Sequence, residues 1–239
     1  MLKLSYDFHI HSCLSPCADE DMLPSNIIGM SCLKNLDVIA VTDHNSCKNC
    51  PAVLDLARQY NITALPGMEL CTMEEVHVLC LFAKLPDAMK FDEYVASKLL
   101  KIPNEERVFG KQEIYDEEDR KIGMEPYLLI NATSISFDEL GKLMEQFHGI
   151  YIPAHVDKNS NSLLSNLGFI PPDADFPAAE LADLTHFEKL AQLNPYLRKC
   201  SIITDSDAHM LGNINEAVNF LECESRSRED ILKAIIKKR

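Results

Sequence analysis

The chain has 239 residues, of which 46% are hydrophobic, and its formal net charge is −14 at pH 7. This length suits one α/β barrel or two small domains, and the composition is typical of a soluble globular protein. No run approaches the roughly 20 apolar residues of a membrane span, and so acidic a chain is expected to repel long nucleic acid.

The N-terminal segment and the cysteines indicate the cellular compartment. The segment MLKLSYDFHIHS reaches histidine too early for a signal peptide, which favours a cytoplasmic location. Cys71, Cys80 and Cys200 lie in apolar runs, where a reduced, buried thiol is the ordinary interpretation. Cys47 and Cys50 form a CxxC pair, but no second pair completes a zinc knuckle, so a structural or redox role is the lesser alternative.

Short β-rich runs alternate with helical patterns along the chain. The expected strands are 4–8, 38–41, 63–65, 76–82, 150–153, 179–182, 201–204 and 218–221, and the expected helices are 24–34, 51–60, 136–147, 187–194 and 227–237. Pro24 and Pro51 suit the first turns of two of these helices. The alternation predicts a parallel sheet, and about seven strands favour a sheet closed into a barrel.

Residues 84–135 interrupt this rhythm between the fourth and fifth strands, and 101–125 are rich in charge. We expect a mostly helical insertion that lies over the barrel mouth as a lid. A surface excursion without function is the alternative. No internal repeat and no Gly/Ser linker divides the chain, which predicts a single domain over 1–239.

Histidines and carboxylates gather at the ends of the expected strands. The segments are DFHIH (7–11), TDHN (42–45), PGME (66–69), EVH (75–77), PAHVD (153–157) and TDSDAH (204–209), and they hold six of the eight histidines. In parallel α/β folds the loops at one sheet edge converge on one cavity. The sequence therefore predicts one polar site at this edge.

The local spacing suits metal binding. His9 and His11 at positions i and i+2 of a strand point to the same face, about 6–7 Å apart at Cα, and can share an ion at about 2.1 Å. Asp207 and His209 repeat this spacing. Imidazole with carboxylate favours zinc, manganese or iron, and more than four candidate ligands indicate two or three ions.

A lone strand histidine is more often a structural residue than a ligand, so a single HxH or TDH motif is a weak signal. The occurrence of all these motifs at one edge of the sheet is the strong signal for a metal site. His148, before a strand, and His186, at a helix start, are interpreted as structural.

In chain order, HxH, TDHN, PGME, EVHVL, PAHVD and SDAH resemble the PHP (polymerase and histidinol phosphatase) family of metallohydrolases, over nearly the whole chain. The resemblance implies a distorted (β/α)7 TIM-like barrel with a trinuclear site of zinc, manganese or iron. It further implies phosphoester hydrolysis. The ligand positions that it implies are His9, His11, His44, Glu69, His77, His155, Asp207 and His209.

The segment SCLSPCADEDMLP departs from the family pattern, in which an acidic or histidine ligand follows HxH. Counting back from Pro24 selects Asp19 as the oxygen ligand, and Cys17 and Asp21 are the alternatives. If none of these three binds, the third ion is weak or absent.

The hypothesis is hydrolysis of a small phosphate ester, such as a nucleotide or a histidinol-phosphate-like compound, by a hydroxide that the metal ions activate. The residues expected to take part in catalysis are Asp43, His44, Asp205 and His209, with Asp43 and Asp205 orienting ligand histidines. Lys158 is the candidate for binding the substrate phosphate, and its alternative is an exposed loop lysine.

Three other functions stay open at this point. One is a nuclease-type phosphodiesterase acting on short oligonucleotides, and another is a non-catalytic metal-binding module. The third is amide or nucleobase hydrolysis, which expects a carboxylated lysine on a middle strand, where the sequence has none. Oligomeric state is not indicated by any motif.

Overall fold

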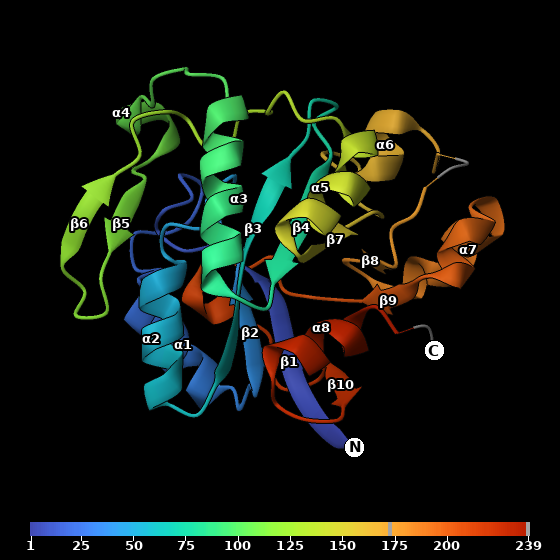
Figure 1. Ribbon diagram of the computed structural model, residues 1–239, viewed down its shortest axis with the longest axis horizontal. Coiled ribbons are helices and arrows are strands. Elements are labelled where there is room, and N and C mark those ends of the chain that lie inside the picture. Colours follow the sequence, from blue (N-terminus) through green and yellow to red (C-terminus); the bar gives the residue numbers. More distant parts are fainter. Residues whose placement is uncertain (172–173, 238–239) are drawn as a thin grey trace.

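The computed structural model describes residues 1–171 and 174–237, which form a mixed α/β fold around a curled, half-barrel sheet (Figure 1). The six-stranded sheet has the order β10 (Phe220–Cys223), β1 (Leu2–Ile10), β2 (Val38–Val41), β3 (Thr63–Cys71), β4 (His77–Phe82) and β7 (Gly149–Pro153). Strands β1, β2 and β3 are parallel to one another.

The expectation of a parallel sheet is wrong for β4 and β10. Strand β4 pairs antiparallel with β3 and with β7, and β10 pairs antiparallel with β1. Only residues 72–76 separate β3 from β4. A parallel connection needs a crossover of a dozen or more residues, whereas a short turn is sufficient for an antiparallel pair.

A second, parallel pair of strands continues the curl beyond β7. This pair is β8 (Ala178–Glu180) with β9 (Ser201–Ile203). The backbone N–H of Val156, just after β7, donates to the carbonyl of Glu180 at 2.9 Å. Downstream of β9, Ala208 forms a parallel bridge with Ile10 at the end of β1. Both ends of the chain thus supply backbone to the same edge of the sheet.

Helices cover the outside of the curl. They are α1 (Pro24–Leu33), α2 (Cys50–Gln59), α3 (Leu85–Lys98), α5 (Leu140–Phe147), α6 (Leu163–Leu167), α7 (Phe187–Leu193) and α8 (Arg228–Ile235), with 3-10 turns η1 (Phe137–Glu139), η2 (Leu184–His186), η3 (Pro195–Lys199) and η4 (Leu211–Asn213). Pro24 and Pro51 stand in first turns as expected. Figure 1 shows α3 and α5 across β3, β4 and β7.

The apolar residues divide between the inside and the outside of the curl. Phe8, Leu65, Leu79 and Ile152 are fully buried or nearly so in a cluster built mainly from the strands. On the outside, Phe91 of α3 belongs to a larger cluster that also takes in β4 and α5. Sheet faces buried on both sides explain why the strands contain near-continuous apolar runs.

The segment between β4 and β7 is not the mostly helical insertion that was expected. Helix α3 is part of the core. It is followed by the single turn α4 (Glu106–Phe109) and by a hairpin of β5 (Glu113–Tyr115) and β6 (Lys121–Met124). Asp116 closes the hairpin turn, since its carboxylate accepts the N–H groups of Glu118 and Arg120 at 3.1 and 2.9 Å. Such side-chain bonds favour turns over helix.

The hairpin attaches to the loop that follows β1, because the N–H of Glu113 donates to the carbonyl of Cys13 at 3.2 Å. Within the described ranges, no helix has both the length and the apolar character needed to cross a membrane.

Candidate metal centre

Two fully buried histidines lie where strand β1 ends, His9 within the strand and His11 one residue beyond it. His9 and His11 have no solvent exposure, and their Nε2 atoms lie 3.2 Å apart. The i, i+2 spacing on a strand is what turns both rings to one face. The Oδ1 atom of Asp207 lies 3.4 Å from Nε2 of His9 and 3.3 Å from Nε2 of His11.

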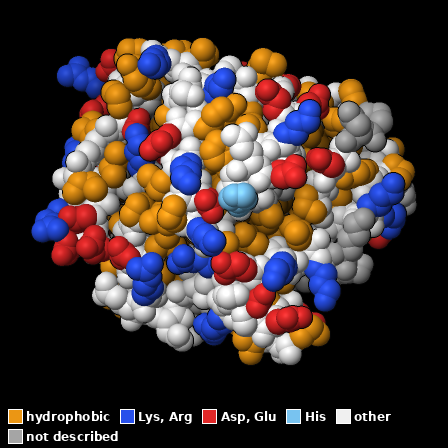
Figure 2. All heavy atoms as spheres, in the orientation of Figure 1, with side chains coloured by type: hydrophobic (Ala, Val, Ile, Leu, Met, Phe, Trp, Pro, Cys, Tyr) orange, Lys and Arg blue, Asp and Glu red, His pale blue; other side chains and the backbone are white. Residues whose placement is uncertain are grey.

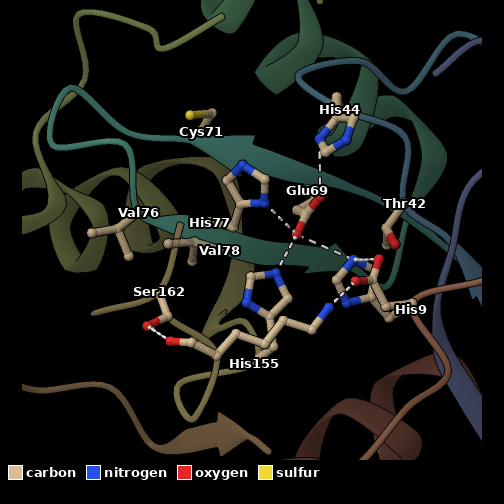
Figure 3. Close-up of polar contacts among 12 residues, drawn as sticks. His9, Thr42, His44, Glu69, Cys71, Val76, His77, Val78, His155 and Ser162 are labelled. Carbon is tan, nitrogen blue, oxygen red and sulfur yellow. Dashed lines mark hydrogen bonds and ion pairs between the residues drawn. The ribbon is translucent and has the colours of Figure 1, made fainter. Parts of the chain in front are cut away.

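Glu69 of β3 lies at the centre of the cluster, and Figure 3 shows His9, His44, His77 and His155 turned toward it. The distances from its Oε1 are 3.2 Å to His9 Nε2, 2.9 Å to His77 Nδ1 and 3.3 Å to His155 Nε2, and those from its Oε2 are 2.9 Å to His44 Nδ1 and 3.4 Å to His11 Nε2. One buried carboxylate therefore contacts five imidazoles from four segments of the chain.

The reversed direction of β4 accounts for the place of His77. This residue begins β4, and Cys71, which ends β3, is its partner in the antiparallel register. The start of β4 therefore lies at the same edge as the ends of β1, β2 and β3. In a parallel β4 the same residue would be at the opposite edge of the sheet.

The donor atoms fit divalent ions. Four ligands at about 2.1 Å from one ion are about 3.4 Å apart when tetrahedral, and octahedral neighbours are about 3.0 Å apart. The separations around Glu69 fall in this range. Glu69 Oε2 and His44 Nδ1 lie close without hydrogen-bond geometry, and His155 Nδ1 is buried without a partner in the described part of the chain. Buried polar atoms left in this way point to a missing ligand.

Three groups of side chains in the described ranges have the spacing of a metal site. They are His11, His44 and His209; His9, His11 and Glu69; and His44, Glu69 and His77. The groups share members, so ions bound in them would be neighbours. The ring of His209, which is partly exposed, stacks on that of His11 with centroids 4.2 Å apart.

The side chains of the cluster shift one another's pKa values in opposite directions. Burial alone would raise the pKa of Glu69, but the facing His77, His9 and His44 hold it well below its usual range. Burial likewise opposes protonation of His77, yet Glu69 raises its pKa to about 10. By contrast, burial and the neighbouring His44 lower the pKa of His11 well below normal. A histidine binds a metal ion as the neutral ring, so bound ions would take the place of the protons that Glu69 favours on these imidazoles.

Glu180 is a site residue that the sequence analysis missed. It ends β8, is buried, and its Oε1 and Oε2 both lie 3.1 Å from Nδ1 of His9. Its Oε2 also accepts the backbone N–H of His155 at 2.8 Å. A carboxylate behind a histidine fixes the ring and leaves Nε2 free for a metal. The available signal was an acidic residue within the apolar run FPAAELA.

Asp43 binds two serines that were also missed, and one of them, Ser15, connects it to the cluster. Its carboxylate accepts the hydroxyls of Ser12 and Ser15 at 2.6 and 2.7 Å. The Ser15 hydroxyl also lies 3.0 Å from Nδ1 of His11. Asp43 is therefore connected to His11 through Ser15, and burial raises its pKa.

Asp205 holds the backbone of β1. Its Oδ1 accepts the N–H of Phe8 at 2.6 Å, and among the described residues it forms no hydrogen bond with a histidine. Burial, with Glu180 and Asp7 nearby, raises the pKa of Asp205 well above normal. Asp7 in turn accepts the N–H groups of Ser206 and Asn215 at 3.0 Å each. These two carboxylates tie the segment after β9 to β1.

Lys158 lies at the mouth of the cluster and pairs with Asp207 Oδ2. Asp207 has a backbone φ of 50° and His155 one of 32°. Such conformations are strained for residues with a side chain and tend to occur at functional sites. Lys158, Ser160 and Asn161 line a pocket of about 200 Å³, whose other walls are His44, Glu69, His77, His155, Asp207 and His209.

The segment after His11 holds the three candidates for a further metal ligand, which are Cys17, Asp19 and Asp21. The backbone N–H of Asp19 donates to the carbonyl of His209 at 2.9 Å, but its exposed carboxylate accepts the N–H of Asp21. Cys17 is exposed at the surface, and partial desolvation together with the charge of Glu69 raises the pKa of its thiol to about 12. Both His148 and His186 lie outside the three groups, and their structural role stays a prediction.

No protein-family model and no curated protein matches this chain. Its fold is similar to that of the lesion-specific endonuclease Q of Pyrococcus furiosus, with a TM-score of 0.69 and 19% identity over 98% of this chain. The chain spans 56% of that protein. A proposed metal-dependent phosphoesterase from Bifidobacterium adolescentis has a TM-score of 0.62 at 16% identity, covering 96% of both chains. An amidohydrolase from Chromobacterium violaceum has 0.58 at 15%, covering 89% of this chain and 90% of its own.

The fold therefore belongs to a class that includes metal-dependent hydrolases, and it agrees with the resemblance to the PHP family carried by the motifs. One expectation is corrected. Endonuclease Q is also known in complex with a 27-mer duplex bearing an abasic lesion. A net charge of −14 is thus no ground for excluding long nucleic acid, because bound cations would reverse the potential at one site whatever the overall charge.

Proposed function

We propose that this protein is a metal-dependent phosphoesterase. The observation that carries the proposal is the convergence of five buried histidines on the carboxylate of Glu69. A purely structural role does not account for it, because so many imidazoles around one carboxylate repel one another and leave buried atoms unpaired.

The proposed ligands are His9, His11, His44, Glu69, His77, His155, Asp207 and His209, with Asp19 as a further candidate beside Cys17 and Asp21. Two or three ions are proposed because the three groups overlap. Mixed imidazole and carboxylate donors favour zinc, manganese or iron over calcium or magnesium. The strands around these ligands are proposed to be the seven of a PHP-type barrel, namely β1, β2, β3, β4, β7, β8 and β9.

When bound, such ions supply Lewis acidity toward a phosphoryl oxygen and toward the attacking water. The protein's own residues hold the site for this chemistry. Glu180 orients His9, and Asp43 orients His11 through Ser15. We assign Lys158 to one oxygen of the substrate phosphate, since its ammonium is at the mouth and faces the cluster.

A small phosphate ester is the first candidate substrate. A pocket of about 200 Å³ accepts a phosphoryl group and little more, so the leaving group would project from the mouth. The phosphodiester of a nucleic acid is the second candidate, favoured by the likeness to endonuclease Q over 98% of this chain. Amide hydrolysis has less support: the strands of the described ranges carry Lys3 and Lys121, both exposed, and no lysine in the cluster.

The test is turnover of p-nitrophenyl phosphate, bis-p-nitrophenyl phosphate, an abasic duplex and an amide, each with manganese, zinc and iron. We expect hydrolysis of phosphate esters that Glu69→Gln lowers by more than about 100-fold, together with a loss of bound metal. The matched control is Glu75→Gln, on the exposed turn between β3 and β4. Turnover of the amide alone, or activity that survives in Glu69→Gln, would overturn the proposal.

A further inference from the structure

A surface groove of about 580 Å³ lies at the end of the sheet away from the metal centre. It is formed where the end of α2, the start of β3, the start of α3 and the start of α8 meet. Thr63 opens β3 in this groove and Glu69 lies six residues later, which places the two sites about 20 Å apart along the strand. A substrate held in the small pocket at the metals does not extend this far.

The groove is basic in an acidic protein. Its lining includes Arg58, Lys84, Arg226 and Arg228, with Glu229 as the one carboxylate among the described lining residues. Figure 2 shows the face carrying α2, α3 and α8, where Lys and Arg side chains lie below the centre together with Asp and Glu side chains. For a chain of net charge −14, four cations beside one carboxylate in the same lining are a local excess of positive charge.

Two of these cations lack a carboxylate. Arg58 pairs with Asp55 and Arg226 with Asp37, whereas Lys84 and Arg228 form no ion pair within residues 1–171 and 174–237. Arg228 donates through Nε to the carbonyl of Ala64 at 2.8 Å and is half-buried. Burial and the like charge of Arg58 lower its pKa, and the charge of Glu229 acts in the opposite direction. A bound anion would offset the repulsion between the two guanidinium groups.

The remainder of the lining is apolar apart from Thr63 and Ser227. Leu54, Ala57, Ile62, Leu85 and Pro86 form its walls. A groove of this volume is large enough for a small organic molecule and larger than a single inorganic ion needs. Guanidinium groups bind phosphate through paired N–H donors, and an apolar wall suits a flat ring.

From this combination we propose that the groove binds a small organic phosphate of the nucleoside diphosphate class, at a site separate from the metal centre. The inference does not depend on the proposed hydrolase activity, because none of its residues contacts the histidine cluster. The occupant would bind to the N-terminal end of β3, the strand that carries Glu69 at its other end.

The experiment is calorimetric titration of ADP into the full chain with excess EDTA, so that the metal centre cannot bind the phosphates. We expect saturable binding of one ADP, weakened at least tenfold by Lys84→Glu, an exposed position whose substitution leaves the core intact. Arg228→Ala is expected to act in the same direction. The matched control is Lys90→Ala, an exposed lysine on the same helix outside the groove, with unchanged affinity.

His155→Ala distinguishes the groove from the metal centre and is expected to leave ADP binding unchanged. ADP is expected to bind at least tenfold more tightly than inorganic pyrophosphate. The proposal is overturned by any of four results: no saturable binding, indifference to Lys84→Glu, loss of binding in His155→Ala, or equal binding of pyrophosphate. Lys84-dependent binding of a DNA duplex without binding of ADP would instead assign the groove to nucleic acid.

Discussion

The carboxylate of Glu180 lies 3.1 Å from Nδ1 of His9, a residue 171 positions earlier in the chain. Both side chains are buried, and the same carboxylate accepts the backbone N–H of His155. Two of the proposed metal ligands therefore depend on one acidic residue that is not itself among them. This relationship explains how β8, a strand of three residues, contributes to the site.

Glu180→Gln removes the negative charge behind His9 while preserving the shape of the side chain. We expect metal affinity or activity to fall by about 10- to 100-fold. With an amide in place of the carboxylate, the imidazole of His9 is a weaker base and its orientation is less fixed. Metal content by mass spectrometry and phosphoesterase turnover measure the two effects. Glu222→Gln, on the exposed side of β10, is the control and should match the unsubstituted protein. If the metal content and turnover of Glu180→Gln equal those of the unsubstituted protein, the charge of Glu180 does not contribute to metal binding.

Lys158→Met tests the assignment of the ammonium at the mouth. Loss of a charge-assisted contact of about 1.5–3 kcal/mol is expected to raise KM for phosphorylated substrates by roughly 10- to 100-fold. Metal content should stay the same, because Asp207 remains free to bind. Lys189→Met, exposed on α7, serves as the control. A fall in metal content with KM unchanged would mean that Lys158 only holds Asp207.

Metal removal is expected to destabilise the protein. Ions present at 100 times their dissociation constant stabilise the folded state by about 2.7 kcal/mol, which corresponds to about 5–10 °C in Tm for a chain of this size. Chelation should lower Tm by this amount, and added zinc or manganese should restore it. In Glu69→Gln the response should be much smaller. Equal responses of the two proteins would place the stabilising ion elsewhere.

Asp37 predicts a stability effect at low pH. Partial burial alone would raise the pKa of Asp37. Hydrogen bonds from Ser5 at 3.0 Å and the ion pair with Arg226 outweigh this effect and lower the pKa below the usual 3.8. A lowered pKa in the folded state stabilises above the unfolded value, and this contribution is lost as pH falls through the folded pKa. Asp37→Asn should therefore cost about 1 kcal/mol at pH 7 and progressively less below about pH 4.

The measurement for Asp37 is urea unfolding at several pH values, compared with Asp55→Asn as an exposed control. A difference between Asp37→Asn and the unsubstituted protein that stays constant down to pH 2 would contradict this account.

Local features were predicted well because they depend on neighbours in the chain. The starts of α1 and α2 at Pro24 and Cys50 lie within a residue of the expected positions, since proline in a first turn is a local signal. Strand β3 extends to Cys71 rather than ending at residue 65, because Gly67 and Pro66 are usually read as breaks. Gly67 is needed there: a Cβ would lie 2.6 Å from the carbonyl of Cys80 on β4.

The parallel direction expected for β4 and β10 was wrong, although the short connection over 72–76 was a usable signal for β4. The hairpin of β5 and β6 was missed because its charged residues are equally compatible with a solvated helix. The candidate Asp19 stays a prediction, because a residue count along an irregular loop does not determine where its carboxylate points.

The sequence by itself determined the kinds of atom available for a site and the faces to which neighbouring residues turn. His9 and His11 share a face because backbone geometry alternates side chains with a period of two. Only the tertiary structure decided that Glu180 stands behind His9 and that the reversal of β4 brings His77 to the same edge. Those contacts join distant parts of the chain, and no local preference encodes them, since they arise when the sheet curls to bury its apolar faces.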